Sequence, residues 1–225
     1  MLGQEWDVLY STGKHDNSWP WSDLVSLYFR YFKLLDLQES GPKVLELGSG
    51  TGNNFRFWSS QRADYFGIEM SSSAAEICVE RFPELRGKLD VRDFSQLDFE
   101  IEKFDIICDR ASVTHCNNSG VQNTIRSSLK SLKKGGLYFG IDWFSKNHSD
   151  FELPSHQVDS NTRSDFIAGQ FMGLGQVHFV NREEILGIFK DFEIIELTEK
   201  VVSKHFPAEN SHQLASWNVV ARKPS

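Results

Sequence analysis

Residues 43–52 constrain the fold of this chain more than any other stretch. The apolar run Lys-Val-Leu-Glu-Leu is followed by glycines at three alternate positions, Gly48, Gly50 and Gly52. The run is typical of a buried parallel strand, and the glycines indicate a tight turn into a helix. Because glycine has no Cβ, the backbone there can bend sharply and approach a ligand closely. The stretch predicts a turn that binds a nucleotide-like cofactor at the carboxyl edge of an open sheet.

The spacing of the glycines argues against two common nucleotide-binding motifs. A dinucleotide fingerprint requires a small residue at the position of Asn53. A P-loop requires Gly-Lys-Ser or Gly-Lys-Thr, and neither tripeptide occurs in the sequence. The pattern that remains is E-x-G-x-G-x-G, which begins at Glu46.

Five segments together resemble the class I S-adenosylmethionine (SAM)-dependent methyltransferases, and the likeness covers roughly residues 40–222. They occur in the order of that family, at residues 44–52, 66–70, 89–94, 104–109 and 132–137. The resemblance implies an α/β, Rossmann-like fold with a seven-stranded, mostly parallel sheet. It also implies an antiparallel C-terminal strand and helices on both faces of the sheet.

Two acids take their roles from this resemblance. In the family, the acid that ends the second strand chelates the ribose hydroxyls, and the acid that ends the third contacts the adenine amino group. These positions correspond to Glu69 and Asp93. Glu69 also follows Gly48 by 21 residues, close to the ~20-residue offset at which an acid meets a ribose. Asp93 has a second interpretation, as the cap of the short segment 94–97.

Glu46 lies beneath the predicted turn, where two roles are open to it. It receives the amino group of the methionine moiety, or it satisfies backbone N–H groups of the turn as a buried acid. The remaining residues predicted to bind the cofactor are Trp21, Gly48, Gly50, Gly52, Asn53, Asn54, Met70, Phe94 and Asp109.

The predicted chemistry lies just after the fourth strand. Methyl transfer from a sulfonium needs an aligned acceptor and a base when that acceptor is a hydroxyl. His115 is the candidate base because its ordinary pKa lies near neutrality, although it would equally suit a hydrogen bond to loop backbone. Arg110 is predicted to hold an anionic acceptor or to pair with Asp109 or Asp142. Asp142 is predicted to orient His115 or a substrate hydroxyl, and His178 to close the acceptor pocket.

Composition narrows the class of partner and the compartment. The formal charge is −7, from 31 acids and 24 bases, so no global attraction to nucleic acid is expected. The three cysteines form no spaced framework, which suits reduced thiols in the cytoplasm. The sequence has no signal-like N-terminus and no apolar run of about 18 residues, so no membrane association is expected. It also has no spaced Cys/His pair, and no metal is predicted.

The chain is expected to form one domain over residues 1–225, and its strands and helices to alternate as in a parallel sheet. Residues 1–40 are predicted to form an N-terminal flap and helix, with Ser22 capping a helix over 21–37 and Trp19 or Trp21 lining the cofactor mouth. Residues 143–180 are predicted to form a lid. Other expected elements are strands 43–47, 64–69, 88–91, 104–109, 136–142, 191–198 and 214–222, and helices 52–60, 72–81, 119–132 and one capped by Asn181.

These observations predict a SAM-dependent methyltransferase that acts on a hydroxyl or amine of a small polar metabolite, such as a sugar or nucleotide-linked sugar. The Asn/Asp-Pro-Pro-Tyr/Phe motif of adenine methyltransferases is absent, which argues against a DNA base. One alternative is a non-catalytic module that binds SAM or S-adenosylhomocysteine as a sensor or scaffold. An NAD-linked oxidoreductase is a weaker alternative. The sequence predicts neither the acceptor nor the oligomeric state.

Overall fold

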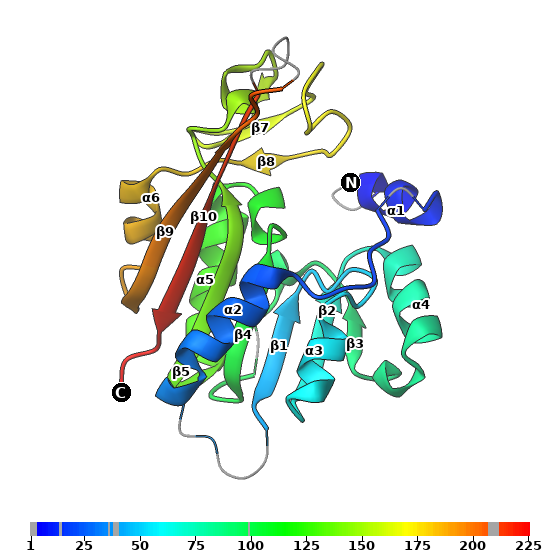
Figure 1. Cartoon of the computed structure of the whole chain (residues 1–225), viewed down its shortest axis with the longest axis vertical. Helices are drawn as coiled ribbons and strands as arrows, with labels where there is room; N and C mark the ends of the chain where they lie inside the picture. The colour runs from blue at the N-terminus through cyan, green and yellow to red at the C-terminus, as the bar shows by residue number, and fades with distance from the viewer. Residues whose placement is uncertain (1–3, 14, 36, 38–40, 99, 207–211) are drawn as a thin grey trace.

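The computed structural model describes residues 4–13, 15–35, 37, 41–98, 100–206 and 212–225 (Figure 1). Parts of the predicted flap, residues 1–3, 14, 36 and 38–40, lie outside the described residues.

The α-helices are α1 (Gln4–Ser11), α2 (Ser22–Tyr31), α3 (Phe55–Ser60), α4 (Ser72–Arg81), α5 (Asn118–Ser131) and α6 (Arg182–Ile188). The 3₁₀ turns are η1 (Phe32–Leu34), η2 (Pro83–Leu85), η3 (Phe94–Gln96), η4 (Val113–His115) and η5 (Ser149–Glu152). The strands are β1 (Lys43–Leu47), β2 (Asp64–Glu69), β3 (Leu89–Val91), β4 (Phe104–Arg110), β5 (Leu132–Phe144), β6 (His156–Gln157), β7 (Thr162–Ser164), β8 (Val177–His178), β9 (Glu193–Ser203) and β10 (Gln213–Arg222).

The main sheet has seven strands in the order β3-β2-β1-β4-β5-β10-β9. Neighbours from β3 to β5 pair in parallel, whereas β10 runs antiparallel to both β5 and β9. This arrangement confirms the predicted Rossmann-like sheet with one antiparallel C-terminal strand. Because β1, β2 and β4 are parallel neighbours, the loops after them meet at one edge of the sheet.

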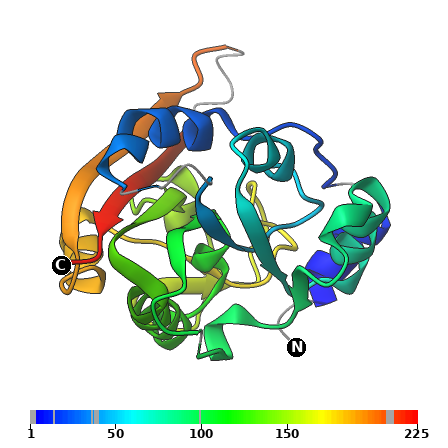
Figure 2. The same ribbon diagram turned by 90° about the horizontal axis from the view of Figure 1, so that it is seen from below.

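Helices cover both faces of the sheet, as Figure 2 shows from below. Successive side chains of a strand point to opposite faces, and β1 illustrates this alternation. Val44 belongs to a hydrophobic cluster with α2 and α3, while Leu45 belongs to a separate cluster with α5 and α6. The two clusters form the core on either side of the sheet.

The N-terminal helix differs from its prediction at both ends. Helix α2 begins at Ser22 itself, and the residue in the cap position is Trp21, which makes no side-chain capping hydrogen bond. The predicted Ser22 cap is therefore wrong, because this serine already belongs to the first turn. The α-helix ends at Tyr31 and continues as η1, well short of residue 37. By contrast, Asn181 caps α6 in a reciprocal capping box with Glu184, as predicted.

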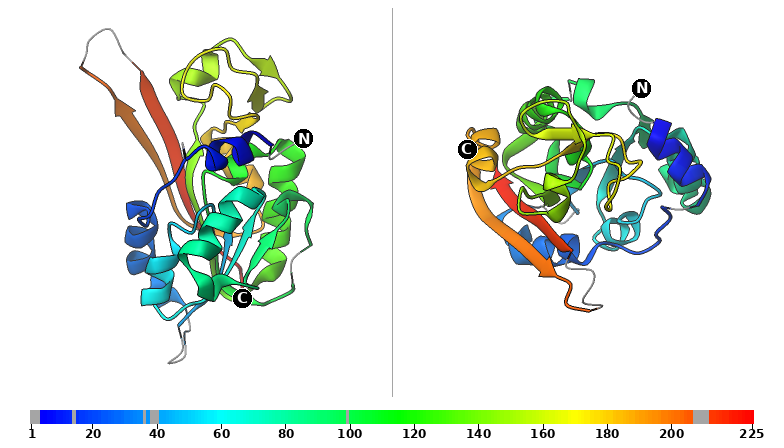
Figure 3. Two further views of the ribbon diagram at one scale, coloured as in Figure 1. Left: turned by 90° about the vertical axis from the view of Figure 1, so that its right-hand side faces the viewer. Right: turned by 90° about the horizontal axis from the view of Figure 1, so that it is seen from above.

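Residues 143–180 lie over the carboxyl edge of the main sheet (Figures 1 and 3). Strand β5 extends to Phe144, and the chain then forms η5 and a small antiparallel sheet of β6, β7 and β8. This segment has its own hydrophobic cluster, which contains Phe166, Phe171, Val177 and Phe179. Helix α1 lies at the same end of the molecule and approaches the segment, since Glu5 is adjacent to Gly175. We call residues 145–180 the lid.

Candidate functional site

The glycine turn joins β1 to α3 at the carboxyl edge of the sheet. Gly48, Gly50 and Gly52 all have positive φ, between 54° and 81°. At Gly48 a Cβ atom would also lie 2.3 Å from the Cβ of Ser112, which packs against the turn from the neighbouring β4 loop. The turn thus requires glycine for its backbone conformation and for the close approach of the next loop.

A cavity of about 480 Å³ opens beside this turn. Its volume falls within the range typical of small-molecule sites. Its wall combines the turn, the ends of β2 and β4, the N-terminal segment and the lid. The lining residues are Trp6, Tyr10, His15, Asp16, Asn17, Trp21, Glu46, Gly48, Ser49, Gly50, Asn53, Asn54, Glu69, Met70, Asp93, Phe94, Arg110, Ala111, Ser112, His115, Cys116, Phe144, Gln170, Phe171 and Leu174.

Glu69 connects the end of β2 to the glycine turn. Its carboxylate accepts hydrogen bonds of 2.8 Å from the backbone N–H groups of Gly50 and Ser71. Burial raises the pKa of Glu69, and the two backbone donors partly offset that effect. Each carboxylate oxygen has a second lone pair, so this side chain can still accept hydrogen bonds from a vicinal diol.

Glu46 is buried below the turn and contacts side chains rather than the backbone. It accepts hydrogen bonds from Asn54 Nδ2 at 2.6 Å and from the Tyr65 hydroxyl at 2.8 Å. Burial raises the pKa of Glu46 from its ordinary value of 4.5 to about 7, despite these two donors. Among the described residues, Glu46 accepts its hydrogen bonds from side chains, so the predicted hydrogen bonds from backbone N–H groups of the turn are not present. A carboxyl group that lines the cavity and titrates near neutrality suits a cationic amino group as its ligand.

Asp93, Phe94 and Met70 all line the cavity. Asp93 caps η3 by accepting a 2.9 Å hydrogen bond from the backbone N–H of Ser95. It also lines the cavity, so its role as a cap leaves the predicted contact with an adenine open to it. Phe94 is buried, and Met70 follows the acid at the end of β2. Among these three side chains, Phe94 and Met70 offer apolar surfaces and Asp93 offers a hydrogen-bond acceptor, a combination that suits a purine base.

The N-terminal segment closes one side of the cavity. Asp16 forms a salt bridge of 2.8 Å with Arg81 of α4, and Thr51 of the glycine turn donates a hydrogen bond to Asp16. These contacts attach the segment to the rim of the turn. Trp6 and Tyr10 project from α1 to the cavity, and the sequence analysis missed both. Trp6 and Tyr10 are four residues apart and so lie on one face of this short helix. That spacing is the sequence feature from which their shared position could have been predicted.

Trp21 and Arg110 form a stacked pair at the rim of the cavity. The guanidinium carbon of Arg110 lies 3.7 Å from the centroid of the Trp21 ring. Arg110 Nε also donates to Asp142 at 3.0 Å, which confirms one of the salt bridges considered for this arginine. The backbone N–H of Trp21 donates to Asn54 Oδ1. Trp21 is thus joined to the loop after β1 through Asn54 and to the end of β4 through Arg110.

His115 lies in η4, between the rings of Trp6 and Phe144. The ring centroids are 4.7 Å and 5.8 Å from that of His115, respectively. Its Nδ1 donates to the carbonyl oxygen of Gln176 at 2.8 Å, since a carbonyl can only accept. Burial lowers the pKa of His115 to about 4. The imidazole is therefore neutral at pH 7, with its lone pair on Nε2.

Three residues of the predicted site do not line the cavity. Gly52 faces α4, where a Cβ would lie 2.6 Å from the Cys78 sulfur. Asp109 is buried behind the site, and its carboxylate accepts hydrogen bonds from Tyr138 and Trp143. Asp142 pairs with Arg110 and Lys200 and makes no contact with His115 among its hydrogen bonds in the described residues, so it does not orient that ring.

Two further residues of the prediction also lie away from the cavity. Trp19 is 72% exposed, so Trp21 is the one of the two predicted tryptophans that lines the cavity. His178 is buried in β8 of the lid, where its Nδ1 pairs with the Thr162 hydroxyl at 3.0 Å. The lid instead contributes Gln170, Phe171 and Leu174, none of which the sequence analysis selected.

Comparisons with known proteins agree with this architecture. Residues 44–136 match the family described as "Methyltransferase domain". An uncharacterized methyltransferase of Anoxybacillus flavithermus is 24% identical over 149 residues, which are 66% of this chain and 69% of the relative.

Solved structures show the same fold. A SAM-dependent methyltransferase from Methanosarcina mazei superposes with a TM-score of 0.66 at 19% identity, covering 91% of this chain and 99% of that one. TehB from Haemophilus influenzae gives a TM-score of 0.64 at 18% identity, covering 96% and 67% of the two chains.

The family match spans the glycine turn and the strands that follow it, and the fold encloses a cavity at that turn. These findings support a class I SAM-dependent methyltransferase, with the family match covering residues 44–136 of the chain. Every helix in the described residues is too short or too polar to cross a lipid bilayer.

Proposed function

We propose that this methyltransferase transfers the methyl group of SAM to a hydroxyl or amine of a small polar metabolite. The observation that carries the proposal is that two sets of side chains line one cavity, and we assign the first to the cofactor, as the cofactor wall, and the second to the acceptor, as the acceptor wall. The first comprises the glycine turn, Glu69 and Asp93, and the second comprises His115, Phe144 and Phe171. A cavity lined on two sides by the N-terminal segment and the lid favours a compact acceptor over a polymer.

The cofactor wall suggests how SAM lies. Glu69 would accept hydrogen bonds from the two ribose hydroxyls, and Asp93 and Phe94 would contact the adenine. The amino group of the methionine moiety would meet Glu46, with Asn53 and Asn54 beside it. This placement directs the sulfonium toward the loop after β4, where Arg110 and His115 lie.

The chemistry needs little from the protein beyond alignment. In the transfer, the acceptor oxygen or nitrogen forms a bond to the methyl carbon while the carbon–sulfur bond breaks, giving S-adenosylhomocysteine. The proton of the acceptor goes to Nε2 of His115 or to solvent. Because its pKa is about 4, His115 is neutral at pH 7 but is a weak base. A hydroxyl acceptor would therefore lose its proton only as its bond to the methyl carbon forms, and a neutral amine needs no base before it attacks.

The narrower class that we propose to test first is a sugar or a nucleotide-linked sugar. The aromatic rings of Trp6, Phe144 and Phe171 give the cavity flat apolar faces, and Gln170 adds a polar side chain on the lid. Such a wall suits a compact ring that carries several polar substituents.

Transfer of a labelled methyl group from SAM tests the proposal. The acceptors would be free sugars, nucleotide-linked sugars, small amines and phenols, with His115→Ala as the comparison variant. We expect product with at least one of these classes and a lower kcat in the variant. Binding of SAM without transfer to any small molecule in a cell extract would contradict the proposed acceptor class and favour the sensor alternative.

A further inference from the structure

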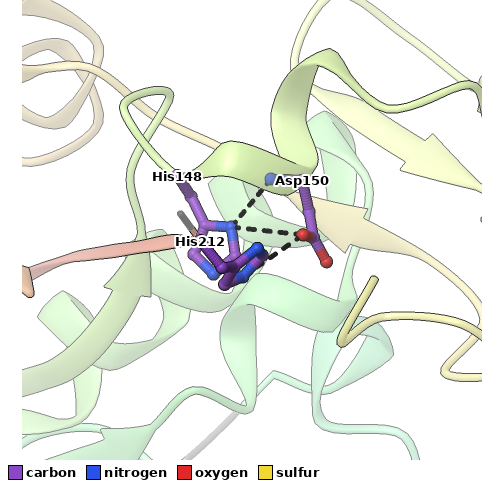
Figure 4. A group of neighbouring side chains, drawn as sticks. All are labelled: His148, Asp150 and His212. Atoms are coloured by element: carbon purple, nitrogen blue, oxygen red, sulfur yellow. Dashed lines mark hydrogen bonds and ion pairs between the residues drawn. The ribbon is translucent and has the colours of Figure 1, made fainter. Parts of the chain in front are cut away.

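A second group of polar side chains converges outside the cavity. His148 immediately precedes η5, Asp150 lies within it, and His212 comes directly before β10. Each offers one ligand atom, and these atoms lie within 4.8 Å of one another. Figure 4 shows both imidazole rings facing the Asp150 carboxylate.

Three side-chain atoms in this group lack a hydrogen-bond partner in the described part of the chain: Asp150 Oδ1, His148 Nε2 and His212 Nε2. Asp150 is fully buried, and its Oδ1 accepts no hydrogen bond from the described residues. A buried carboxylate oxygen without a donor is costly, so such an atom points to an absent ligand. His148 is also buried, at 3% exposure, which places two of the three side chains in the interior.

We propose that His148, Asp150 and His212 bind a divalent transition-metal ion, such as Zn²⁺. Two imidazoles and one carboxylate are a donor set that this class of ion prefers. His212 Nε2 lies 3.4 Å from Asp150 Oδ1, and His148 Nδ1 lies 3.9 Å from the same oxygen. In a tetrahedral site with bonds of about 2.1 Å, ligand atoms are about 3.4 Å apart, so the two distances to Asp150 Oδ1 are close to those of a metal site. The ligand atoms of the two imidazoles lie within 4.8 Å of each other and would have to move closer together where they exceed that spacing.

The surroundings of the group would hold these ligands in place. The second oxygen of Asp150, Oδ2, accepts hydrogen bonds from the backbone N–H groups of Gln170 at 2.7 Å and Phe171 at 3.3 Å. These bonds fix the carboxylate with Oδ1 directed at the histidines, as outer-shell contacts do in metal sites. His148 Nδ1 accepts a 3.1 Å hydrogen bond from the backbone N–H of Asp150, which the metal bond would replace. Three protein ligands leave a fourth position for water.

The ion would join three separate segments. Ser149 Oγ already accepts a 2.8 Å hydrogen bond from the backbone N–H of Gln213, so η5 and the start of β10 are in contact. Asp150 links η5 to Gln170 and Phe171, which line the cavity. A metal at this point would fix the lid wall of the cavity to the long β9–β10 hairpin.

Calorimetric titration of chelator-treated full-length protein with Zn²⁺ tests the site. We expect binding of one ion per chain and a higher Tm when Zn²⁺ is present. His212→Ala should weaken binding at least tenfold and remove the rise in Tm. His156→Ala is the matched control, because His156 is an exposed histidine of the same lid and lies outside the group. This variant should bind Zn²⁺ like the wild type.

A second probe keeps the test independent of folding defects. Co²⁺ should give d–d absorption bands typical of a site with nitrogen and oxygen ligands, and these bands should be absent in His212→Ala. The His212 side chain is 28% exposed, so circular dichroism should show this variant folded. Absence of stoichiometric binding, or equal binding by His212→Ala, would overturn the proposal. A Tm that responds to pH but not to Zn²⁺ would instead identify the group as a proton-linked ion pair and would equally overturn it.

Discussion

Glu46 of β1 and Tyr65 of the neighbouring strand β2 are joined by a 2.8 Å hydrogen bond beneath the glycine turn. This bond does not offset the burial of the carboxyl group, whose pKa is raised to about 7. At neutral pH the unliganded enzyme is therefore divided between the protonated and ionised forms of Glu46. A cation beside this carboxyl would favour the ionised form.

Binding of SAM should accordingly release a proton. The amino group of SAM is positively charged, so its arrival beside Glu46 lowers the pKa of that carboxyl. Release should be largest between pH 6 and 7, where the free enzyme still carries the proton. Titrations in two buffers of different ionisation enthalpy measure it. Glu46→Gln should show no such release, and an equal release by both proteins would place the proton elsewhere.

The same carboxyl should give stability a distinct pH dependence. Its folded pKa of about 7 exceeds the unfolded value of 4.5, so its contribution is present below pH 4.5 and is lost as pH rises through 7. His115 and His178, whose pKa values are lowered to about 4, act in the opposite direction below pH 6.5.

The difference between Glu46→Gln and the wild type isolates this effect from the histidines. Without cofactor, the free energy of unfolding of the variant should rise relative to that of the wild type as pH increases from 5 to 8, by about 3 kcal/mol at most. Urea unfolding at each pH gives the two free energies of unfolding. A difference that stayed constant over this range would show that Glu46 does not titrate in the folded protein.

His115→Ala should lower kcat while leaving the Kd for SAM nearly unchanged. We assign the ring to the acceptor wall of the cavity, and so we expect it to act on the acceptor alone. We expect a loss of roughly 10²-fold in kcat. Because the pKa of His115 is about 4, the wild-type kcat should show no inflection from this residue between pH 5 and 8. An unchanged kcat in the variant would contradict its role.

Gly52→Ala should destabilise the protein without a direct effect on the cavity wall. Gly52 has a φ of +81°, and a Cβ there would lie 2.6 Å from the Cys78 sulfur and 3.1 Å from the Phe82 ring. Backbone strain and overpacking together should cost about 2–4 kcal/mol. Thermal unfolding measures the loss, and Gly187→Ala, at a position with open space, serves as the control. Equal Tm values for the two variants would contradict this explanation.

Sequence patterns predicted the mostly parallel main sheet and its antiparallel C-terminal strand, and most of the residues they selected around the glycine turn line the cavity. The apolar runs and the glycine spacing are patterns within short stretches of sequence, and each pattern indicates one strand or one turn. Glu69, Asp93 and Asn54 could thus be predicted from the turn and from strand ends, which parallel pairing brings to one edge. Trp6 and the lid residue Phe171 also line the cavity but were not predicted. Tertiary packing brings them to the cavity, and no local sequence pattern indicates that placement.

Packing also explains where the predicted catalytic group differs from the structure. Arg110, His115 and Asp142 follow adjacent strands, which suggested that they act together. The structure brings Arg110 to Asp142 but holds His115 against Gln176 of the lid. The group of His148, Asp150 and His212 could not be predicted from the sequence either, because tertiary packing brings it together: His212 follows Asp150 by 62 positions in the chain.

Calorimetric titration of SAM into Glu69→Gln tests the central assignment most directly. The variant keeps an acceptor for one of the two backbone N–H groups but loses the charge that would hold the ribose. We predict that affinity for SAM and for S-adenosylhomocysteine falls by roughly tenfold to a hundredfold, since hydrogen bonds to charged groups contribute ~1.5–3 kcal/mol. Glu183→Gln, a change at an exposed acid of α6, should bind like the wild type. A folded Glu69→Gln protein that bound SAM with wild-type affinity would contradict the account.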